Sequence, residues 1–575
     1  MATLYNSELL DFTGGLSTVT APHLIRKNEA REFVNIDITY GSLKSIPTLH
    51  LLKKVPYAFF YEFFGKLITY SEWRANAELN NILYWTNGAE QGKILQDGTE
   101  LPIGMATPQT PLAWKIQDVG VLKGSLKYCY TFYDSNTGTE GPPSPLSSYA
   151  NVDEQNLILT GFEPLPSNAD SYRIYRVGGY LARFTLVDTV TNVSNGYLDD
   201  RSEREVDGRI LETLNASAPP GNIENFIEYG GRLFGSVGTK VYYSAIGNGD
   251  SWYVFDFFEM PNNVKALAKT VDGILVMGAT YTKLIQGYSP STFRVRTISS
   301  EVGCISNRTV AYIQGAPIWL STTNFYMYTG KLINITYKRL NEVTGLDPSS
   351  SVVHNDVYYL TFAPTMSPSE ELYPNDDLYP GAMKGTGENE LADGIVYIDF
   401  KRGAGFSYGT RTYNNSVSIG IFKNTPYLIT FNKLELIDEC DTVIDCEKLV
   451  CEGSYYLNRI DVVVGNNYKS VHYVSPRLID GSYSTLKEYD KVRLNFIGQF
   501  KVKVIFDDNK VVVEELISSD NLFKDTTIDI ELLEDKLAII GIPNNNNKSY
   551  SIAFDIEGYG VIKSIQYSWK PRELP

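Results

Sequence analysis

The feature that most constrains the fold is a repeat of about forty residues, which combines a turn with short strands rich in apolar residues and tyrosine. Gly231, Gly273 and Gly315 occupy the same place in three consecutive copies, so the spacing is 42 residues twice in succession. A fourth copy begins at Asn355, and a fifth fits around Asn424 once an insertion is set aside. Strand repeats of this length are typical of β-propeller blades, and because one blade cannot bury its own faces, several must stack around an axis.

The composition supports a large all-β protein. At 575 residues the chain exceeds one hydrophobic core, so we expect about three or four domains. Its 41 tyrosines favour strands and broad contact surfaces. The net charge of −16 argues against sequence-specific recognition of DNA or RNA, which needs a basic surface, although an acidic wall suits a tube through which DNA slides.

Four regions follow from the strand pattern and the linkers. Residues 1–111 are strand-like and are expected to start the propeller. Residues 112–215 carry about seven short strands, the pattern of a small β-sandwich, and resemble a fibronectin type III-like domain. Residues 216–450 hold the repeats, interrupted by an insertion at 363–393 that is rich in Pro, Gly, Glu and Asp. Residues 451–575 are again all strands and are expected to form a C-terminal β domain.

Carboxylates are the first candidates for catalysis, because propeller glycosidases use paired acids. Asp250, Asp256, Asp272 and Asp399 fall near expected strand ends, where acids are also common as turn residues. The sequence contains no phosphate-binding loop or sialidase-type repeat. We therefore predict no catalytic residues and no cofactor, and expect that the protein is not an enzyme.

Metal-ligating residues are sparse. The four histidines, at positions 23, 50, 354 and 472, are far apart in the sequence, which contains no Cys-x-x-Cys spacing. Cys440, Cys446 and Cys451 form the one cysteine cluster, either a metal or redox site or incidental thiols in a polar loop. Because their spacing matches no standard zinc motif, we predict no metal site. Cys129 and Cys304 are expected to be small buried residues.

One run of aromatic residues has two interpretations. It is a platform for a sugar, or it fills the space between blades, and the second is the commoner use of such a run. The residues are Trp252, Tyr253, Phe255, Phe257 and Phe258.

Targeting signals are missing from the part of the sequence where they are usually found. The first eleven residues lack the basic and apolar pattern of a secretory signal, and no apolar stretch approaches the length of a membrane span. An odd number of cysteines, five, does not form a disulfide framework. We expect a protein made in a reducing cytosol without a membrane span.

Several stretches together resemble the tail nozzle proteins of short-tailed bacteriophages, a family also described as tail tubular protein B, packaged-DNA stabilisation protein or muzzle. The stretches are Phe12-Thr13-Gly14-Gly15-Leu16, Asn28-Glu29-Ala30, Gly138-Thr139-Glu140-Gly141-Pro142-Pro143, Tyr172-Arg173-Ile174-Tyr175-Arg176, Ser299-Ser300-Glu301-Val302-Gly303, Tyr473-Val474-Ser475-Pro476 and Gly560-Val561-Ile562-Lys563. They span most of the chain as loose patterns, and the family has no catalytic residues to carry over.

The resemblance implies a structural virion protein. It implies a homohexamer at the distal end of the phage tail, below an adaptor ring that residues 1–111 would face, with tail fibres or other distal proteins as neighbours. The tube would retain packaged double-stranded DNA and conduct it during ejection without sequence-specific binding. The protein would be made in the bacterial cytoplasm and end in the virion tail, and the insertion at 363–393 would be a gate, a docking loop or a plain surface loop.

Two alternatives remain open. A carbohydrate-binding or glycan-cleaving β-propeller protein would have converging acids or an exposed aromatic platform. A cellular interaction scaffold would carry the Gly-His and Trp-Asp signatures of other propellers, which the sequence does not contain.

Overall fold

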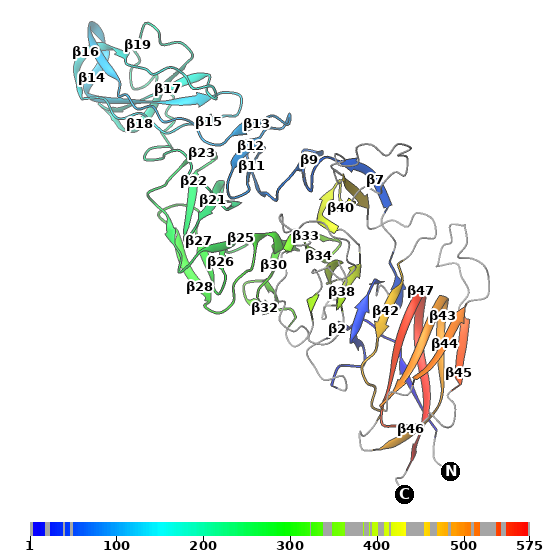
Figure 1. Cartoon of the computed structure of the whole chain (residues 1–575). Helices are drawn as coiled ribbons and strands as arrows, with labels where there is room; N and C mark the ends of the chain where they lie inside the picture. Colours follow the sequence, from blue (N-terminus) through cyan, green and yellow to red (C-terminus); the bar gives the residue numbers. More distant parts are fainter. Residues whose placement is uncertain are drawn as a thin grey trace, which may run out of the picture. The chain divides into compact units, whose positions relative to one another are not determined.

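The computed structural model contains strands and short turns, with one described 3-10 segment, η2 (Asn307–Thr309). It describes all residues except 1–3, 18–23, 38–40, 47–49, 323, 337–347, 363–382, 385–389, 392–393, 401–406, 413–415, 433–453, 460–468, 481–484, 508–510, 518–535, 542–547 and 573–575. The chain divides into two units, residues 74–307 and residues 1–73 with 308–575. Figure 1 shows the strands coloured along the sequence.

The predicted propeller repeat is confirmed. In the described residues, six sets of four antiparallel strands follow one another as in a six-bladed β-propeller arrangement, one of them within a 14-stranded sheet, and further β-sheets are added to them. In residues 74–307, the first blade consists of β10 (Ala75–Leu79), β11 (Ile82–Thr86), β12 (Gln91–Ile94) and β13 (Glu100–Pro102). The second consists of β20 (Asn225–Tyr229), β21 (Arg232–Val237), β22 (Lys240–Ala245) and β23 (Asn248–Trp252), with β24 (Phe258–Glu259) beside β22. The third consists of β25 (Val264–Thr270), β26 (Gly273–Gly278), β27 (Thr282–Gln286) and β28 (Arg294–Ser299).

The other unit holds the remaining three blades. The fourth blade consists of β29 (Ala311–Ile313), β30 (Ala316–Leu320), β31 (Phe325–Tyr328) and β32 (Leu332–Asn334). The fifth consists of β33 (Pro348–His354), β34 (Val357–Phe362), β37 (Gly394–Asp399) and β38 (Ser407–Thr412). The sixth consists of β39 (Ser416–Phe422), β40 (Thr425–Asn432), β41 (Ser454–Arg459) and β7 (His50–Val55). An N-terminal strand, β7, thus completes the last blade, and the hairpin of β8 (Phe59–Phe63) and β9 (Lys66–Tyr70) packs beside β39.

The repeat is visible in the sequence because most blades begin with the same kind of turn. Two consecutive residues have positive φ between the first and second strands at Asn80-Asn81, Gly230-Gly231, Gln314-Gly315, Asn355-Asp356 and Lys423-Asn424. This is the type I′ hairpin, whose twist matches that of the strands and which favours Asn and Gly. Val271-Asp272 forms the turn in the blade of β25–β28, where Gly273 begins the second strand.

Neighbouring blades bury apolar faces against each other. One core lies between β10–β13 and β20–β23 and includes Tyr84, Phe226, Leu233 and Trp252. A second core, with Phe234, Tyr243, Leu267 and Ile285 among its members, lies between β20–β24 and β25–β28. This face-to-face burial is what a repeat that cannot cover its own faces requires.

Between β13 and the next blade, the chain forms a six-stranded antiparallel sheet. Its strands are β14 (Ala113–Asp134), β15 (Thr139–Glu140), β16 (Ala150–Thr160), β17 (Ser171–Gly178), β18 (Leu181–Val190) and β19 (Tyr197–Asp199). The expected β domain at 112–215 therefore contains one 22-residue strand and five shorter ones. Its likeness to fibronectin type III domains stays a prediction.

Two 21-residue strands, β43 (Leu486–Phe506) and β47 (Ile552–Arg572), form the centre of the C-terminal region. The sequence pattern predicts each of them as two separate strands, at Lys491–Phe496 and Lys501–Phe506 and at Tyr550–Ile556 and Ile562–Ser568. A straight strand would hold Tyr489 and Phe506 roughly 55 Å apart, yet their ring centroids are 5.7 Å apart. The paired strands therefore fold over on themselves and bury an aromatic core between their halves.

Glycines form the corner of this folded ribbon. Gly498, Gly558 and Gly560 have φ values of 122°, 151° and 130°, and a Cβ at any of them would lie about 2 Å from a carbonyl oxygen of the paired strand. Only glycine permits this close approach of two backbones. Strands β44 (Val511–Ile517), β45 (Lys536–Gly541) and β46 (Lys548–Ser549) flank β43.

The N-terminal segment pairs with the C-terminal strands. Strands β1 (Tyr5–Leu9) and β6 (Leu43–Ser45) pair with β47, and β4 (Glu32–Val34) pairs with β42 (Val471–Val474), which also joins β47. β5 (Ile36–Asp37) pairs with β6, and β2 (Gly15–Leu16) pairs in parallel with β3 (Glu29–Ala30). A single parallel bridge from Val34 to Thr410 links β4 to the blade strand β38, so β4 joins a blade to the C-terminal sheet.

Candidate functional site

Of the four candidate catalytic acids, Asp250 is the one that is fully buried, and it forms an ion pair with Lys93. Its side chain is fully buried, accepts a 2.7 Å hydrogen bond from Lys93 Nζ and another of 2.7 Å from the backbone N–H of Gly104. Burial raises the pKa of the neighbouring Tyr84, and the Asp250 carboxylate adds to that effect. The pair lies between the blades of β10–β13 and β20–β23 and is closed to a substrate.

The other three predicted acids lie in unrelated places. Asp256 accepts a hydrogen bond from Tyr243 OH, and Asp272 is an exposed turn residue between β25 and β26. Asp399 ends β37 in the other unit. In the part of the chain that the structure describes, no three His, Cys, Asp or Glu side chains gather in a group suited to a metal ion.

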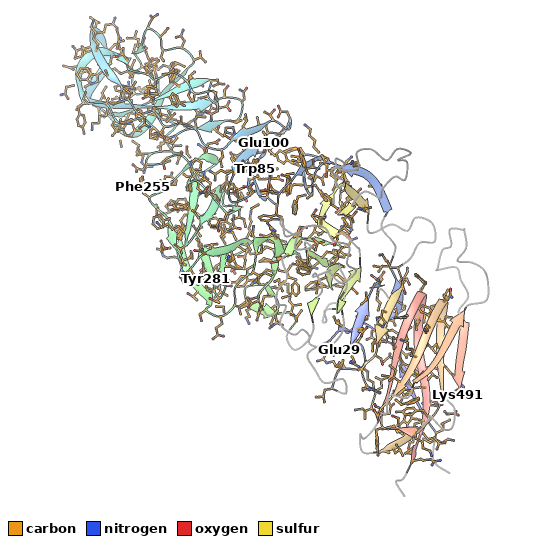
Figure 2. The ribbon with its side chains drawn as sticks, viewed as in Figure 1. Glu29, Trp85, Glu100, Phe255, Tyr281 and Lys491 are labelled. Carbon is orange, nitrogen blue, oxygen red and sulfur yellow. The ribbon has the colours of Figure 1, made fainter. Side chains whose placement is uncertain are left out.

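The aromatic run divides between core and surface. Trp252 is fully buried, and its Nε1–H donates to Gly249 O at 2.7 Å. Tyr253 and Phe258 pack on the core between the blades, and the ring centroid of Phe257 lies 5.6 Å from that of Tyr242. Phe255, labelled in Figure 2, is 89% exposed, so the run mainly packs between strands, with one ring left in solvent.

The predicted cysteine cluster and most of the insertion lie outside the described residues. Cys440, Cys446 and Cys451 belong to this part, and within residues 363–393 the structure describes two short strands, β35 (Met383–Lys384) and β36 (Glu390–Leu391). Cys129 and Cys304 are buried, as predicted. Burial raises the pKa of the Cys129 thiol, as does the nearby Glu140, which keeps this thiol protonated.

A buried polar seam fixes the inserted sheet to the blade of β20–β23. The Glu140 carboxylate accepts hydrogen bonds from Thr131 Oγ1 (2.6 Å), Tyr175 OH (2.6 Å) and Arg173 (2.9 Å). The Glu140 carbonyl oxygen accepts from Asn248 Nδ2 and from Ser251 Oγ (2.7 Å). Glu140 thus takes part both in the polar core of the inserted sheet and in its junction with the blade.

A second charged cluster crosses four adjacent strands of the C-terminal sheet. His472 Nδ1 lies 2.9 Å from Glu32 and its Nε2 3.1 Å from Asp555, which also accepts from Lys503 at 2.8 Å. Hydrogen bonds to Asp555 and Glu32 raise the pKa of His472 to about 10 against the effect of burial, so the imidazole is charged at neutral pH. The row Glu32, His472, Asp555 and Lys503 alternates in sign and ties the N-terminal strand β4 to the sheet.

Sequence reasoning missed both of these clusters. Glu140 and Asn248 are 108 residues apart, and Glu32 and Asp555 are more than 500 apart, so no local pattern links them. The available signal was the Thr139-Glu140-Gly141-Pro142-Pro143 stretch, which the sequence analysis names only for its resemblance to tail nozzle proteins and whose Glu140 holds the junction.

Comparisons with known proteins give only distant structural matches. No protein-family model matches the chain, and no curated protein sequence matches it. Among solved structures, the chain is similar to apo AztD from Citrobacter koseri (8% identity, TM-score 0.24, 53% of this chain and 77% of that chain). It is also similar to the N-terminal domain of Nup159 (9%, TM-score 0.22, 79% and 99%) and to an exo-β-1,3-galactanase from Phanerochaete chrysosporium (9%, TM-score 0.17, 63% and 97%).

Among the described residues, the structure has no helix with the length and apolar character needed to cross a membrane.

Proposed function

We propose that this chain is a structural virion protein, the distal tail tube or nozzle of a short-tailed bacteriophage, and not an enzyme. The observation that carries the proposal is that the buried charged groups join parts of the chain instead of facing a cleft: Lys93 with Asp250 between blades, and Glu140 at the root of the inserted sheet. A scaffold that bears load needs such fixed junctions. The resemblance of the N-terminal Phe12–Leu16 stretch and of the other motifs to nozzle proteins points the same way.

In this proposal the protein assembles as a homohexamer around a channel. An adaptor ring binds above it, tail fibres or distal tail proteins bind around it, and double-stranded DNA passes through the lumen without sequence-specific contacts. The net charge of −16 favours passage over adhesion, because acidic walls repel phosphates. The protein is made in the bacterial cytoplasm, needs no cofactor and resides in the virion tail.

The test is assembly with the adaptor. The purified native chain is mixed with the adaptor ring protein of its own virion, sized by analytical ultracentrifugation and imaged by negative stain. We expect a hollow tube coaxial with the adaptor ring. A chain that stays monomeric and does not bind the adaptor would contradict the proposal, and screening for glycan hydrolysis would then follow.

A further inference from the structure

Tyr229, at the end of β20, and Tyr288, in the loop between β27 and β28, form an aromatic ledge on residues 74–307. Tyr288 is 65% exposed, although its ring stacks on Tyr229 with centroids 5.4 Å apart and planes inclined by 13°. One face of the Tyr288 ring is therefore covered by Tyr229. With so much of its surface exposed, the opposite face is open to solvent.

The loop that carries Tyr288 is held rigid. The hydroxyl of Thr292 accepts hydrogen bonds from the backbone N–H groups of Tyr288 (3.2 Å) and Ser289 (3.1 Å), and Thr292 N–H donates back to Ser289 O at 2.9 Å. The next residue, Phe293, packs on Phe234, Tyr243 and Phe258 and anchors the loop in the core. An exposed ring that is fixed in this way loses little conformational entropy when it binds a ligand.

The neighbouring turn leaves room for the ring. Gly230 lies against it, and a Cβ at this position would come within 3.2 Å of Tyr288 Cδ1. Beside the turn, Glu228 accepts from Gly231 N–H at 3.0 Å and pairs with Lys269 at 2.6 Å.

We propose that this ledge binds a neutral sugar ring of a polysaccharide, with the C–H face of the ring on Tyr288 and a hydroxyl on the carboxylate of Glu228. A pyranose has the size of one tyrosine ring and combines an apolar face with hydroxyl donors on its rim, which matches an open aromatic face beside a carboxylate acceptor. Glu228 is already paired with Lys269, so a neutral ligand can bind without breaking that ion pair.

A protein partner fits this surface less well. A stable protein interface covers about 800 Å² on each side, whereas the exposed apolar contact of the Gly230-Gly231 turn is Ile246, which is half exposed and lies 3.6 Å from a Cβ placed at Gly231. A single sugar ring needs no more than the ledge offers. The residues of the ledge all lie in one unit, and sugar binding is measured separately from ring assembly.

The experiment compares three proteins on a printed array of neutral and anionic bacterial polysaccharides. They are the full chain, Tyr288→Ala, and the control Tyr180→Ala, which removes a tyrosine that is 91% exposed on the β17–β18 hairpin. We expect the full chain and the Tyr180→Ala variant to bind neutral polysaccharides alike, and Tyr288→Ala to bind about tenfold more weakly, the loss of one aromatic contact. The Tyr288→Trp variant should restore binding.

Three outcomes would overturn the inference. They are no binding to any neutral polysaccharide, an equal loss in both alanine variants, and an effect of Tyr288→Ala on oligomer size with none on glycans. The last would assign the ledge to contacts between copies of the chain. Thermal unfolding of each variant checks folding, and sizing of the same samples separates this result from the test of tube assembly.

Discussion

Lys93 and Asp250 show at the scale of single residues why the acids of this chain serve structure. Both side chains are closed to water, and every strong contact of the carboxylate is made within the protein. Moving two charges out of water costs several kcal/mol each, and good geometry only offsets that cost. The pair is therefore sensitive to the loss of either partner.

Removing the carboxylate tests this account. We predict that Asp250→Ala lowers the free energy of unfolding by about 3–5 kcal/mol, because Lys93 is left buried without its partner. Urea denaturation followed by the fluorescence of the nearby tryptophans measures the change. The matched control is Glu154→Ala in the exposed pair of Lys123 and Glu154, which should leave the midpoint unchanged. Equal shifts in the two variants would show that burial does not decide the effect.

The raised pKa of His472 predicts that the stability of the folded chain depends on pH. Its pKa is raised from an ordinary value of 6.5 to about 10, so the folded state binds a proton that the unfolded chain releases between these values. The stabilisation is complete below pH 6.5 and is lost as the pH rises through about 10. We expect the stability difference between the native chain and His472→Gln to shrink over this range, measured by urea midpoints at pH 6, 8 and 10. A difference that grows with pH would contradict the charged imidazole.

At low pH the same cluster weakens for another reason. Burial raises the pKa of Asp555, but hydrogen bonds from His472 and Lys503 outweigh it and leave the pKa below its ordinary value of 3.8. Its contribution to stability is present above that value and is lost as the pH falls through the lowered pKa.

At the scale of elements, the corner of the folded ribbon is the most demanding piece of backbone. We predict that Gly498→Ala disrupts the pairing of β43 with β47, since the added Cβ would lie 2.1 Å from Tyr559 O at a φ of 122°. Thermal unfolding and limited proteolysis of the C-terminal region report the loss. Gly221→Ala, where a Cβ meets nothing within 4 Å, is the control and should unfold like the native chain.

A substitution in one of the hairpin turns is expected to raise the stability of the chain. Gln314 has a φ of 49° in the turn between β29 and β30, a conformation that costs most residues about 1–2 kcal/mol and asparagine less. We expect Gln314→Asn to stabilise the chain by about 0.5 kcal/mol and the β-branched variant Gln314→Val to destabilise it. A thermal midpoint for Gln314→Asn at or below that of the native chain would contradict this account of the turn.

Some elements of this fold could be predicted from the sequence, and others could not. The blades were predictable because the hairpin turns and the strands after them are local and recur every 42 residues in the regular part. The pairing of β1, β4 and β6 with β42 and β47 was not, because it joins residues more than 400 positions apart and leaves no periodic trace. The 21-residue strands were read as two strands each, since glycines such as Gly498 and Gly558 look like turns in a sequence and here are corners.

The candidate site follows the same rule. The acids near strand ends were visible, but their burial and partners were not, and Asp250 proved to be one half of an ion pair with Lys93, 157 residues away. Tyr288 stood in a Gly-Tyr-Ser-Pro stretch that reads as an ordinary loop. Its stacking on Tyr229 appears only when two blades are placed side by side.

The acidic charge of the whole molecule determines how it is expected to interact with duplex DNA. We predict that the assembled protein does not retard duplex DNA in an electrophoretic assay even at low salt, because a net charge of −16 per chain gives no counterion release to drive binding. A salt-sensitive shift at low micromolar protein would contradict passage without binding.

The central claim is that this chain is a ring-forming structural protein, and the native mass of the purified full-length chain tests it most directly. The account predicts a single species that contains six copies of the 64.5 kDa chain and that appears as a hollow ring in negative stain. A monodisperse monomer at all concentrations, unchanged by the adaptor protein, would contradict it.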